Sequence, residues 1–222
     1  MNTWLTFGRD LADQLPLIGH GLLNTILLAS TISVTGLLLG VVVFYLSISR
    51  HAWIRFSSKS YISFFIGMPL IVLLFLMYYG APQFGIKWSP FTVAAIGFTL
   101  NVAAYNAAYL TTAYNSLDPM ELEAARALGF NELQVFRLIT LPQVMRTSVP
   151  ALTNQVISNL KDSSVAFLIQ YTEFFARVQE LAASNFQFFK AYLFAALVYL
   201  AMVSVIVLAS RWLQRRLGLS SS

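Results

Sequence analysis

Long apolar stretches, separated by short polar segments, most strongly constrain what this chain can fold into. Residues 21–46 contain no charged side chain, and a helix of that length can cross a bilayer core of about 30 Å. Only 10% of the 222 residues are charged and 58% are hydrophobic, whereas a soluble domain has about 25% charged residues. So few charged side chains cannot form the polar surface that a soluble domain exposes to water. The sequence therefore predicts an all-α integral membrane protein.

About five transmembrane helices are predicted, and two of them have unusual features. The second contains Pro69, which removes a backbone hydrogen bond and is expected to kink the helix. The fourth contains several polar groups, including Lys161 and Asp162, so we expect it to face protein or a wet path and not lipid. The predicted spans cover residues 21–46, 61–79, 91–114, 149–169 and 191–208.

The basic residues predict the orientation of these spans. Nine of the 14 Lys and Arg residues fall in one set of loops, four in the other set and one, Lys161, within a span. Cytoplasmic loops carry the excess of basic residues. The richer set is therefore expected in the cytoplasm, with the N-terminus periplasmic and the C-terminus cytoplasmic. Its members are Arg50, Arg55, Lys59, Arg126, Arg137, Arg146, Arg211, Arg215 and Arg216.

The chain before the first span has an amphipathic pattern. Trp4, Phe7 and Leu11 recur at helical spacing, with Arg9 on the other face. This pattern predicts that residues 1–20 form a periplasmic segment with a short helix lying in the membrane interface. A frayed terminus is the alternative interpretation.

Residues 118–142 are conspicuously polar among these apolar stretches. The segment begins with Asp118 and Pro119, which suit the N-cap and the first position of a helix. Glu121 follows three residues after the cap, so an approximate capping box is expected. The residues up to 128 are nearly all good helix formers. A short helix is therefore predicted within a cytoplasmic loop that covers residues 114–148.

A second short helix is predicted after a glycine hinge. Gly129 stands where helices commonly end in a left-handed residue. Asn131 is a second N-cap, with Gln134 three residues later, and Pro142 begins a third element. Two capped helices between spans suit a docking element for a cytosolic partner.

Other function classes find little support in the residues. The chain has no cysteine, so it has neither a thiol nucleophile nor a Cys-ligated metal. His20 and His51 have no metal-binding spacing and fit interfacial residues, so no catalytic or metal-ligating residue is assigned. The net charge of +5 is distributed over span ends, which does not indicate nucleic-acid binding. No G-x-x-x-x-G-K-[ST] motif is present, so the chain cannot cradle ATP phosphates by that device.

The segment 118–142 carries a family resemblance. Glu123-Ala124-Ala125, Gly129, Ile139 and Leu141-Pro142 match the loop pattern E-A-A-x3-G-x9-I-x-L-P of bacterial ABC importer permeases at every defined position. The chain resembles the polar amino acid uptake family, with its histidine-, glutamine- and arginine-type permeases, over nearly its whole length. Two other stretches are similar to that family's second and fourth spans, namely Met68-Pro69-Leu70 with Tyr78-Tyr79-Gly80, and Leu160-Lys161-Asp162-Ser163-Ser164.

The resemblance implies the fold and the partners. It implies a single permease domain over residues 1–222, with the type I ABC importer permease fold. It also implies two ATPase subunits that use ATP and Mg²⁺, a second permease subunit and a periplasmic substrate-binding protein. The chain itself would bind no cofactor and would be no enzyme. It would lie in the bacterial inner membrane and take part in the import of polar amino acids or related small zwitterions. The residues that the resemblance assigns to ATPase coupling are Glu123, Ala124, Ala125, Arg126, Gly129, Ile139, Leu141 and Pro142. In the alternative interpretation, Glu123 and Arg126 are only solvated charges on the surface of a helix.

A path for a zwitterionic substrate needs polar groups at mid-membrane depth. The candidates are Asn101, Asn106, Asn154, Asn159, Lys161 and Asp162. Lys161 and Asp162 could instead be neutralised structurally, by each other or by other groups. Asn101 and Asn106 fit interhelical hydrogen bonding somewhat better than substrate contact.

The chain departs from the family pattern at four positions in these spans. Many relatives have Thr, Gln, Glu and Arg where this chain has Met68, Leu73, Ala108 and Thr111. Each difference removes polarity from the expected path. This favours the hypothesis that the chain is one half of a heterodimer rather than a homodimer.

A second class of function was weighed against an importer subunit. An ion-coupled secondary carrier or channel for small polar solutes usually shows an internal repeat and intramembrane acids. The sequence shows no repeat and one buried acid, Asp162, so an ABC importer subunit is the better interpretation.

Overall fold

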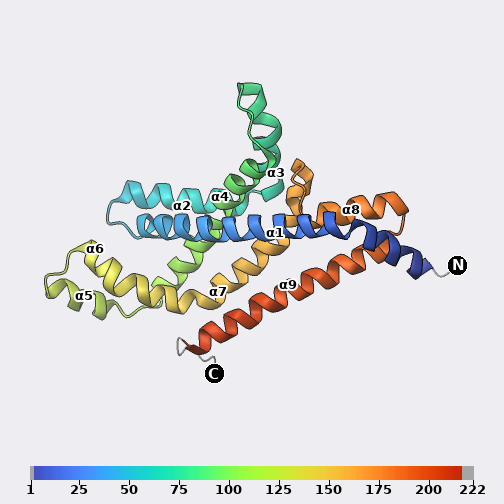
Figure 1. Ribbon diagram of the computed structural model, residues 1–222. Coiled ribbons are helices and arrows are strands. Elements are labelled where there is room, and N and C mark those ends of the chain that lie inside the picture. Colours follow the sequence, from blue (N-terminus) through green and yellow to red (C-terminus); the bar gives the residue numbers. More distant parts are fainter. Residues whose placement is uncertain (1–2, 217–222) are drawn as a thin grey trace.

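The computed structural model describes residues 3–216, and these residues form helices and connections with no strand. The main helices are α1 (Thr3–Ser47), α2 (Ala52–Gly67), α3 (Leu70–Phe75), α4 (Pro90–Tyr114), α5 (Pro119–Ala127), α6 (Glu132–Val135), α7 (Leu141–Asp162), α8 (Phe174–Asn185) and α9 (Phe188–Arg216). Short π or 3₁₀ turns extend some of them: η1 (Leu76–Gly80), η2 (Ala81–Phe84), η3 (Phe136–Thr140) and η4 (Ser163–Ile169). Figure 1 shows α1 along the length of the molecule, with α5 and α6 at one end and the N-terminus at the other. The all-α prediction is confirmed.

Helix α1 is unbroken over 45 residues, and it includes most of the segment predicted to be a separate interfacial helix. Phe7 and Ile18 are buried in a cluster with Phe174 and Val178 of α8. Phe7 of the predicted apolar stripe therefore packs on protein, whereas Trp4 is 52% exposed. The described part of residues 1–20 continues into the first span past Pro16 and is not a separate short helix; its place in the membrane interface stays a prediction, and residues 1 and 2 lie outside the described range.

Helix α4 packs along α1 through two glycines that lie one turn apart. A Cβ atom at Gly36 would lie 2.5 Å from Cγ1 of Val102, and one at Gly40 would lie 2.7 Å from Cβ of Asn106. Side-chain carbons do not approach so closely, so the two helices can only meet here without Cβ atoms on α1. Small residues at this spacing are typical of close contacts between transmembrane helices.

The kink predicted at Pro69 is a complete break. Helix α2 ends at Gly67, and it forms an angle of 98° with the helical segment that begins at Leu70. Because Pro69 has no N–H, it cannot donate a helical hydrogen bond to the carbonyl oxygen of Phe65. Nδ2 of Asn101 in α4 donates to that oxygen instead, at 2.8 Å. The break is thus compensated by a neighbouring helix.

Glu173 joins three helices beside the middle of α1. Its side chain is fully buried. The carboxylate accepts hydrogen bonds from the N–H groups of Phe175 and Ala176 in α8, from Thr25 of α1 at 3.0 Å and from Tyr199 of α9 at 3.4 Å. Four donors nearly saturate the acceptor capacity of a carboxylate. This buried acid therefore fixes α8 and α9 against α1.

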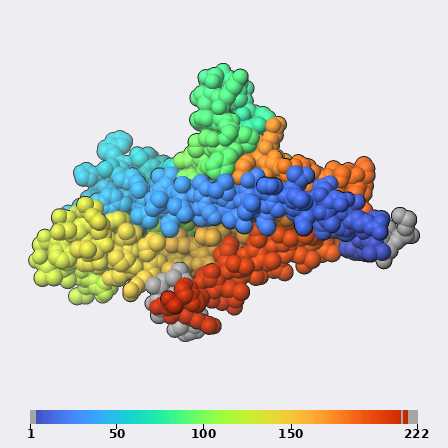
Figure 2. Space-filling model, viewed as in Figure 1, coloured from blue at the N-terminus to red at the C-terminus, as the bar shows by residue number. Residues whose placement is uncertain are grey.

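By length and apolar composition, α1, α4 and α9 can cross a membrane, and the bent segments Ala52–Gly67 and Leu70–Phe84 add a fourth span if they count as one. Helix α7 is not among the described helices that qualify, because it carries the polar side chains that made the fourth predicted span weak. The chain is thus multi-pass, and the number five stays a prediction. Figure 2 shows the region of α3 projecting from the side of the bundle, in green, and α5 and α6 forming one end, in yellow.

Replacing Gly40 with Ala should destabilise the protein by about 1–3 kcal/mol, since the new methyl group overpacks the contact with α4. Gly19→Ala is the matched control, because a Cβ at Gly19 meets no atom within 4 Å. Thermal unfolding in detergent measures both changes. Equal melting temperatures for the two variants would contradict the close contact.

Glu173 should make the stability of the protein depend on pH. Glu173 lies in a connection between spans, and burial raises the pKa of its carboxyl group from 4.5 to about 7, against the hydrogen bonds that lower it. Because the folded pKa exceeds the unfolded one, the stabilisation is complete below pH 4.5 and is lost as the pH rises towards 7. The difference in unfolding free energy between the wild type and Glu173→Gln should therefore fall by up to about 3 kcal/mol between pH 4.5 and 7.5. Unfolding of both proteins at a series of pH values checks this, and a pH-independent difference would refute it.

Candidate functional site

The polar segment forms a compact pair of short helices at one end of the bundle. The carboxylate of Asp118 accepts a hydrogen bond from the N–H of Met120 at 2.9 Å, and Pro119 occupies the first turn of α5, as predicted. Glu121 does not close a capping box with Asp118; its carboxylate accepts a hydrogen bond from Nε2 of Gln143 in α7, at 2.7 Å. That contact ties the start of α5 to the bundle.

The hinge between α5 and α6 has the geometry that the sequence predicted. Gly129 has a φ angle of +87°, which is accessible to glycine without strain. The N–H of Gly129 donates to the carbonyl of Arg126 and that of Phe130 to the carbonyl of Ala125, which is the Schellman pattern of a helix end. Asn131 and Gln134 form a complete capping box at the start of α6. The two helices therefore hold a defined angle.

A small apolar cluster fixes α5 on α6. Leu122, Ala125 and Val135 are buried together, with Tyr114 and Ile139 packed around them. Ala125 is only 3% exposed, so this residue, which the resemblance assigns to ATPase coupling, does not present its methyl group to a partner. Positions 122 and 125 lie on the same face of a helix, and that face points inward.

The opposite surface of the segment is exposed and partly apolar. Glu123 and Ala124 lie on it, and the side chains of Met120 and Leu128 are 74% and 79% exposed. Leu133 is 52% exposed. Apolar side chains gathered on a surface commonly mark a site for another protein. We call this surface of residues 120, 123, 124, 128 and 133 the docking face.

The other residues assigned to ATPase coupling have different surroundings. Arg126, Gly129 and Pro142 are exposed beside the docking face. Ile139 and Leu141 are half-buried and pack into apolar clusters below it. The pattern E-A-A-x3-G-x9-I-x-L-P therefore combines surface positions with positions that hold the segment on the bundle.

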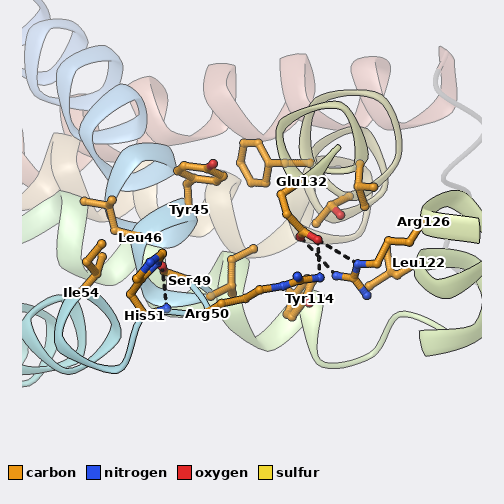
Figure 3. A pocket seen from close by; sticks show the side chains of 14 residues that line it. Tyr45, Leu46, Ser49, Arg50, His51, Ile54, Tyr114, Leu122, Arg126 and Glu132 are labelled. Carbon is orange, nitrogen blue, oxygen red and sulfur yellow. Dashed lines mark hydrogen bonds and ion pairs between the residues drawn. The ribbon is translucent and has the colours of Figure 1, made fainter. Parts of the chain in front are cut away.

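A cavity of about 340 Å³ lies between the end of α1 and the α5–α6 pair. Figure 3 shows Glu132 pointing into it between the guanidinium groups of Arg50 and Arg126, with Tyr45 and Tyr114 nearby. Oε1 of Glu132 accepts a hydrogen bond from Nη2 of Arg50 and one from Nε of Arg126 at 3.1 Å. The link to Arg50 spans 82 positions in the sequence, so no local motif could have indicated it.

A second cavity, of about 590 Å³, lies where the α2–α3 break meets α4 and α7. Of the six predicted path residues, Asn101 and Asp162 line it, together with Met68 and Pro69 beside the break. Further polar lining comes from Tyr105, Tyr109, Gln155 and Ser158. The cavity can accommodate a small ligand, and its aromatic and amide groups can donate hydrogen bonds.

The remaining predicted path residues lie elsewhere. Asn159 is buried in a hydrogen-bonded chain, in which it accepts from Gln155 and donates to Ser33 of α1. Asn106 is buried beside Gly40, and its Oδ1 has no hydrogen-bond partner in the part of the chain that the structure describes. Asn154 and Lys161 are exposed and do not line this cavity.

These contacts bear on two alternatives that the sequence left open, namely the mutual neutralisation of Lys161 and Asp162 and the structural role of Asn101. Among the described residues, Lys161 and Asp162 form no ion pair with each other; the ion pairs are Arg50–Glu132, Arg126–Glu132 and Arg177–Glu180. Asn101 both lines the cavity and satisfies the carbonyl freed by Pro69, so a structural role and a place beside the path coexist.

The chain is similar in sequence to known proteins. Residues 32–219 match the family model described as the binding-protein-dependent transport system inner membrane component. The chain is 35% identical over 209 residues to a probable amino-acid ABC transporter permease protein, PatM, from Vibrio harveyi, covering 93% of this chain and 94% of that protein. It is 33% identical over 211 residues to a protein of the same description, YckA, from Bacillus subtilis (strain 168), covering 95% and 93%.

Solved structures show the same fold. A crystal structure of an amino acid ABC transporter with histidines matches with a TM-score of 0.84 and 28% identity, over 93% of this chain and 96% of that one. The MetNI methionine ABC transporter, in inward-facing conformations, matches with a TM-score of 0.77 over 92% and 97%, at 17% identity. The predicted fold of an ABC importer permease is thereby confirmed.

Asn101→Ala should destabilise the protein by about 1–3 kcal/mol, because the buried carbonyl of Phe65 loses its donor. Asn154→Ala removes the same group from an exposed position and should change stability little. Thermal unfolding of both purified variants tests the difference. If Asn101→Ala unfolds like Asn154→Ala, water or another group satisfies the carbonyl and the compensation argument fails.

Proposed function

The chain belongs to the family of binding-protein-dependent transport system inner membrane components, and we propose that it is the transmembrane subunit of an ATP-driven importer of polar amino acids. The observation that carries this proposal is the α5–α6 pair, with its capped ends, left-handed Gly129 and exposed docking face. A short helix held by fixed caps and a buried cluster can transmit a push as a rigid body. The names of similar permeases support amino acids as the substrate class.

The energy for transport comes from a separate subunit. The sequence lacks the P-loop motif, so this chain cannot cradle ATP phosphates by that device, and the proposal places ATP hydrolysis in a partner. Two ATPase subunits, which use ATP and Mg²⁺, would seat the docking face, and a substrate-binding protein would deliver the amino acid on the other side. The coupling positions are Glu123, Ala124, Ala125, Arg126, Gly129, Ile139, Leu141 and Pro142, with Ala125 acting from inside the segment.

The docking face would lie in the cytoplasm, with the N-terminus in the periplasm and the C-terminus in the cytoplasm. The excess of basic residues in one set of loops supports this orientation. Two loops of that set are joined by Glu132, which binds both Arg50 and Arg126. Lys190 of the other set lies 5.0 Å from the ring centroid of Trp4, at the opposite end of α1. The protein would therefore sit in the bacterial inner membrane with α5 and α6 inside the cell.

The substrate path would run through the cavity beside the α2–α3 break, where Asn101 and Asp162 offer an amide and a carboxylate. A carboxylate suits the ammonium group of a zwitterion, and amide or phenol donors suit its carboxylate. A second permease subunit, preferably a different chain, would complete the path.

Gly129→Asp tests the coupling role. In the complete transporter, amino acid uptake driven by ATP should fall by about tenfold or more, the size of a typical coupling free energy between sites. No described atom lies within 4 Å of a Cβ at Gly129, so the change adds backbone strain at φ +87° but no clash, and the subunit should still insert in the membrane. Uptake by proteoliposomes and membrane recovery of the subunit measure the two effects.

Gly85→Asp is the matched control, because Gly85 also has a positive φ angle, +77°, and open space around its Cβ position. It lies away from the docking face, in the connection before α4. Uptake should survive this change. Wild-type uptake in Gly129→Asp, or an equal loss in both variants, would argue against a specific docking role.

A further inference from the structure

We propose that Glu132 is a positioning residue that makes the coupling helix α5 and the end of α1 move as one unit. The proposal rests on the proposed function, since it concerns how a push on the docking face reaches the membrane bundle. Glu132 lies outside the family's loop pattern, and no local motif assigns it a role.

The geometry places Glu132 at the meeting point of three segments. It is the first residue of α6, directly after the Asn131 cap. Its carboxylate binds Arg126 in the last turn of α5 through two hydrogen bonds, to Nε at 3.1 Å and to Nη2 at 3.4 Å. The same Oε1 atom binds Arg50, three residues beyond the end of α1. Figure 3 shows the two guanidinium groups converging on this one carboxylate.

Stability alone does not account for this arrangement. The side chains of Arg50 and Glu132 are 68% and 48% exposed, and exposed ion pairs contribute at most about 1 kcal/mol. What the bonds do provide is direction, because a planar guanidinium group that binds a carboxylate through two donors fixes their relative orientation. Arg126 therefore sets the angle of α5 to Glu132, and Arg50 sets the position of Glu132 relative to α1.

Helix α1 is well placed to receive such a push. It runs the length of the molecule (Figure 1) and packs closely on α4 through Gly36 and Gly40. The middle of α1 is fixed to α8 and α9 through Thr25 and Glu173, and its N-terminal part packs on α8 through Phe7 and Ile18. A displacement of α5 that is transferred to α1 would therefore reach the opposite face of the membrane. Without Glu132, α5 would still be held by its apolar cluster, but with a looser angle to α1.

Glu132→Gln in the complete transporter tests the proposal. The variant should assemble and hydrolyse ATP, while the amount of amino acid taken up per ATP falls about fivefold, equivalent to about 1 kcal/mol. Arg50→Gln should have the same effect, and the double variant should be no worse than either single one, because all three remove the same link. Arg55→Gln is the control of equal charge; Arg55 donates to the carbonyl of Ser49 and not to Glu132.

A distance measurement separates positioning from plain stability. The chain has no cysteine, so spin labels at Ala52→Cys and Ala127→Cys report the separation of the start of α2, two residues after Arg50, from the end of α5. Their distance distribution should be narrow with Glu132 and broader with Glu132→Gln, at an unchanged melting temperature. If the wild-type complex transports and Glu132→Gln matches it in both uptake per ATP and distance distribution, the inference is refuted while the proposed function stands. A wild-type complex that does not transport would refute the proposed function itself.

Discussion

The contact between α1 and α4 is the constraint on which the rest of the structure depends. In a membrane, apolar surface alone does not drive helices together, so close packing and hydrogen bonds must. Gly36 and Gly40 let the backbone of α4 approach α1 to distances that no side chain would allow. The hydroxyl groups of Thr35 and Thr99 then meet at 2.6 Å on the same seam. With these two helices fixed, α2, α7 and α8 attach to one or both of them, and α9 attaches through α7 and α8.

Two kinds of contact hold the α5–α6 pair, and they have different functions. Local ones give it shape: the caps at Asp118 and Asn131 and the left-handed Gly129 require only neighbouring residues. Distant ones give it a place on the bundle, through Glu121 with Gln143 and through Glu132 with Arg50. A segment that is rigid in itself and tied to the bundle by apolar packing and by these polar links can transfer a push without changing its own shape. This suits an element that has to pass on a movement.

The sequence predicted those features that depend on nearby residues. The break at Pro69, the helix ends at Gly129 and Asn131, and the polar character of α7 follow from backbone chemistry or composition. Contacts that tertiary packing decides were not predicted. Phe7 packs on α8, a neighbour that no local pattern indicates. Ala125 points inward for the same reason. Gly36 and Gly40 are four positions apart, and this spacing of small residues is itself typical of a close contact between transmembrane helices.

The four apolar departures from the family pattern can now be separated by position. Met68 lines the cavity at the α2–α3 break, whereas Leu73, Ala108 and Thr111 are not among its lining residues. Thr111 donates to the carbonyl of Ala107 and meets the hydroxyl of Ser47 at 3.3 Å, so it belongs to the contact between α1 and α4. An arginine there would have to leave that seam, because its side chain is too long for a contact built around glycines. The loss of polarity at the path is therefore concentrated at Met68, directly beside the proline that opens the cavity. A partner chain with a polar residue at the equivalent turn would restore the missing group from across the path.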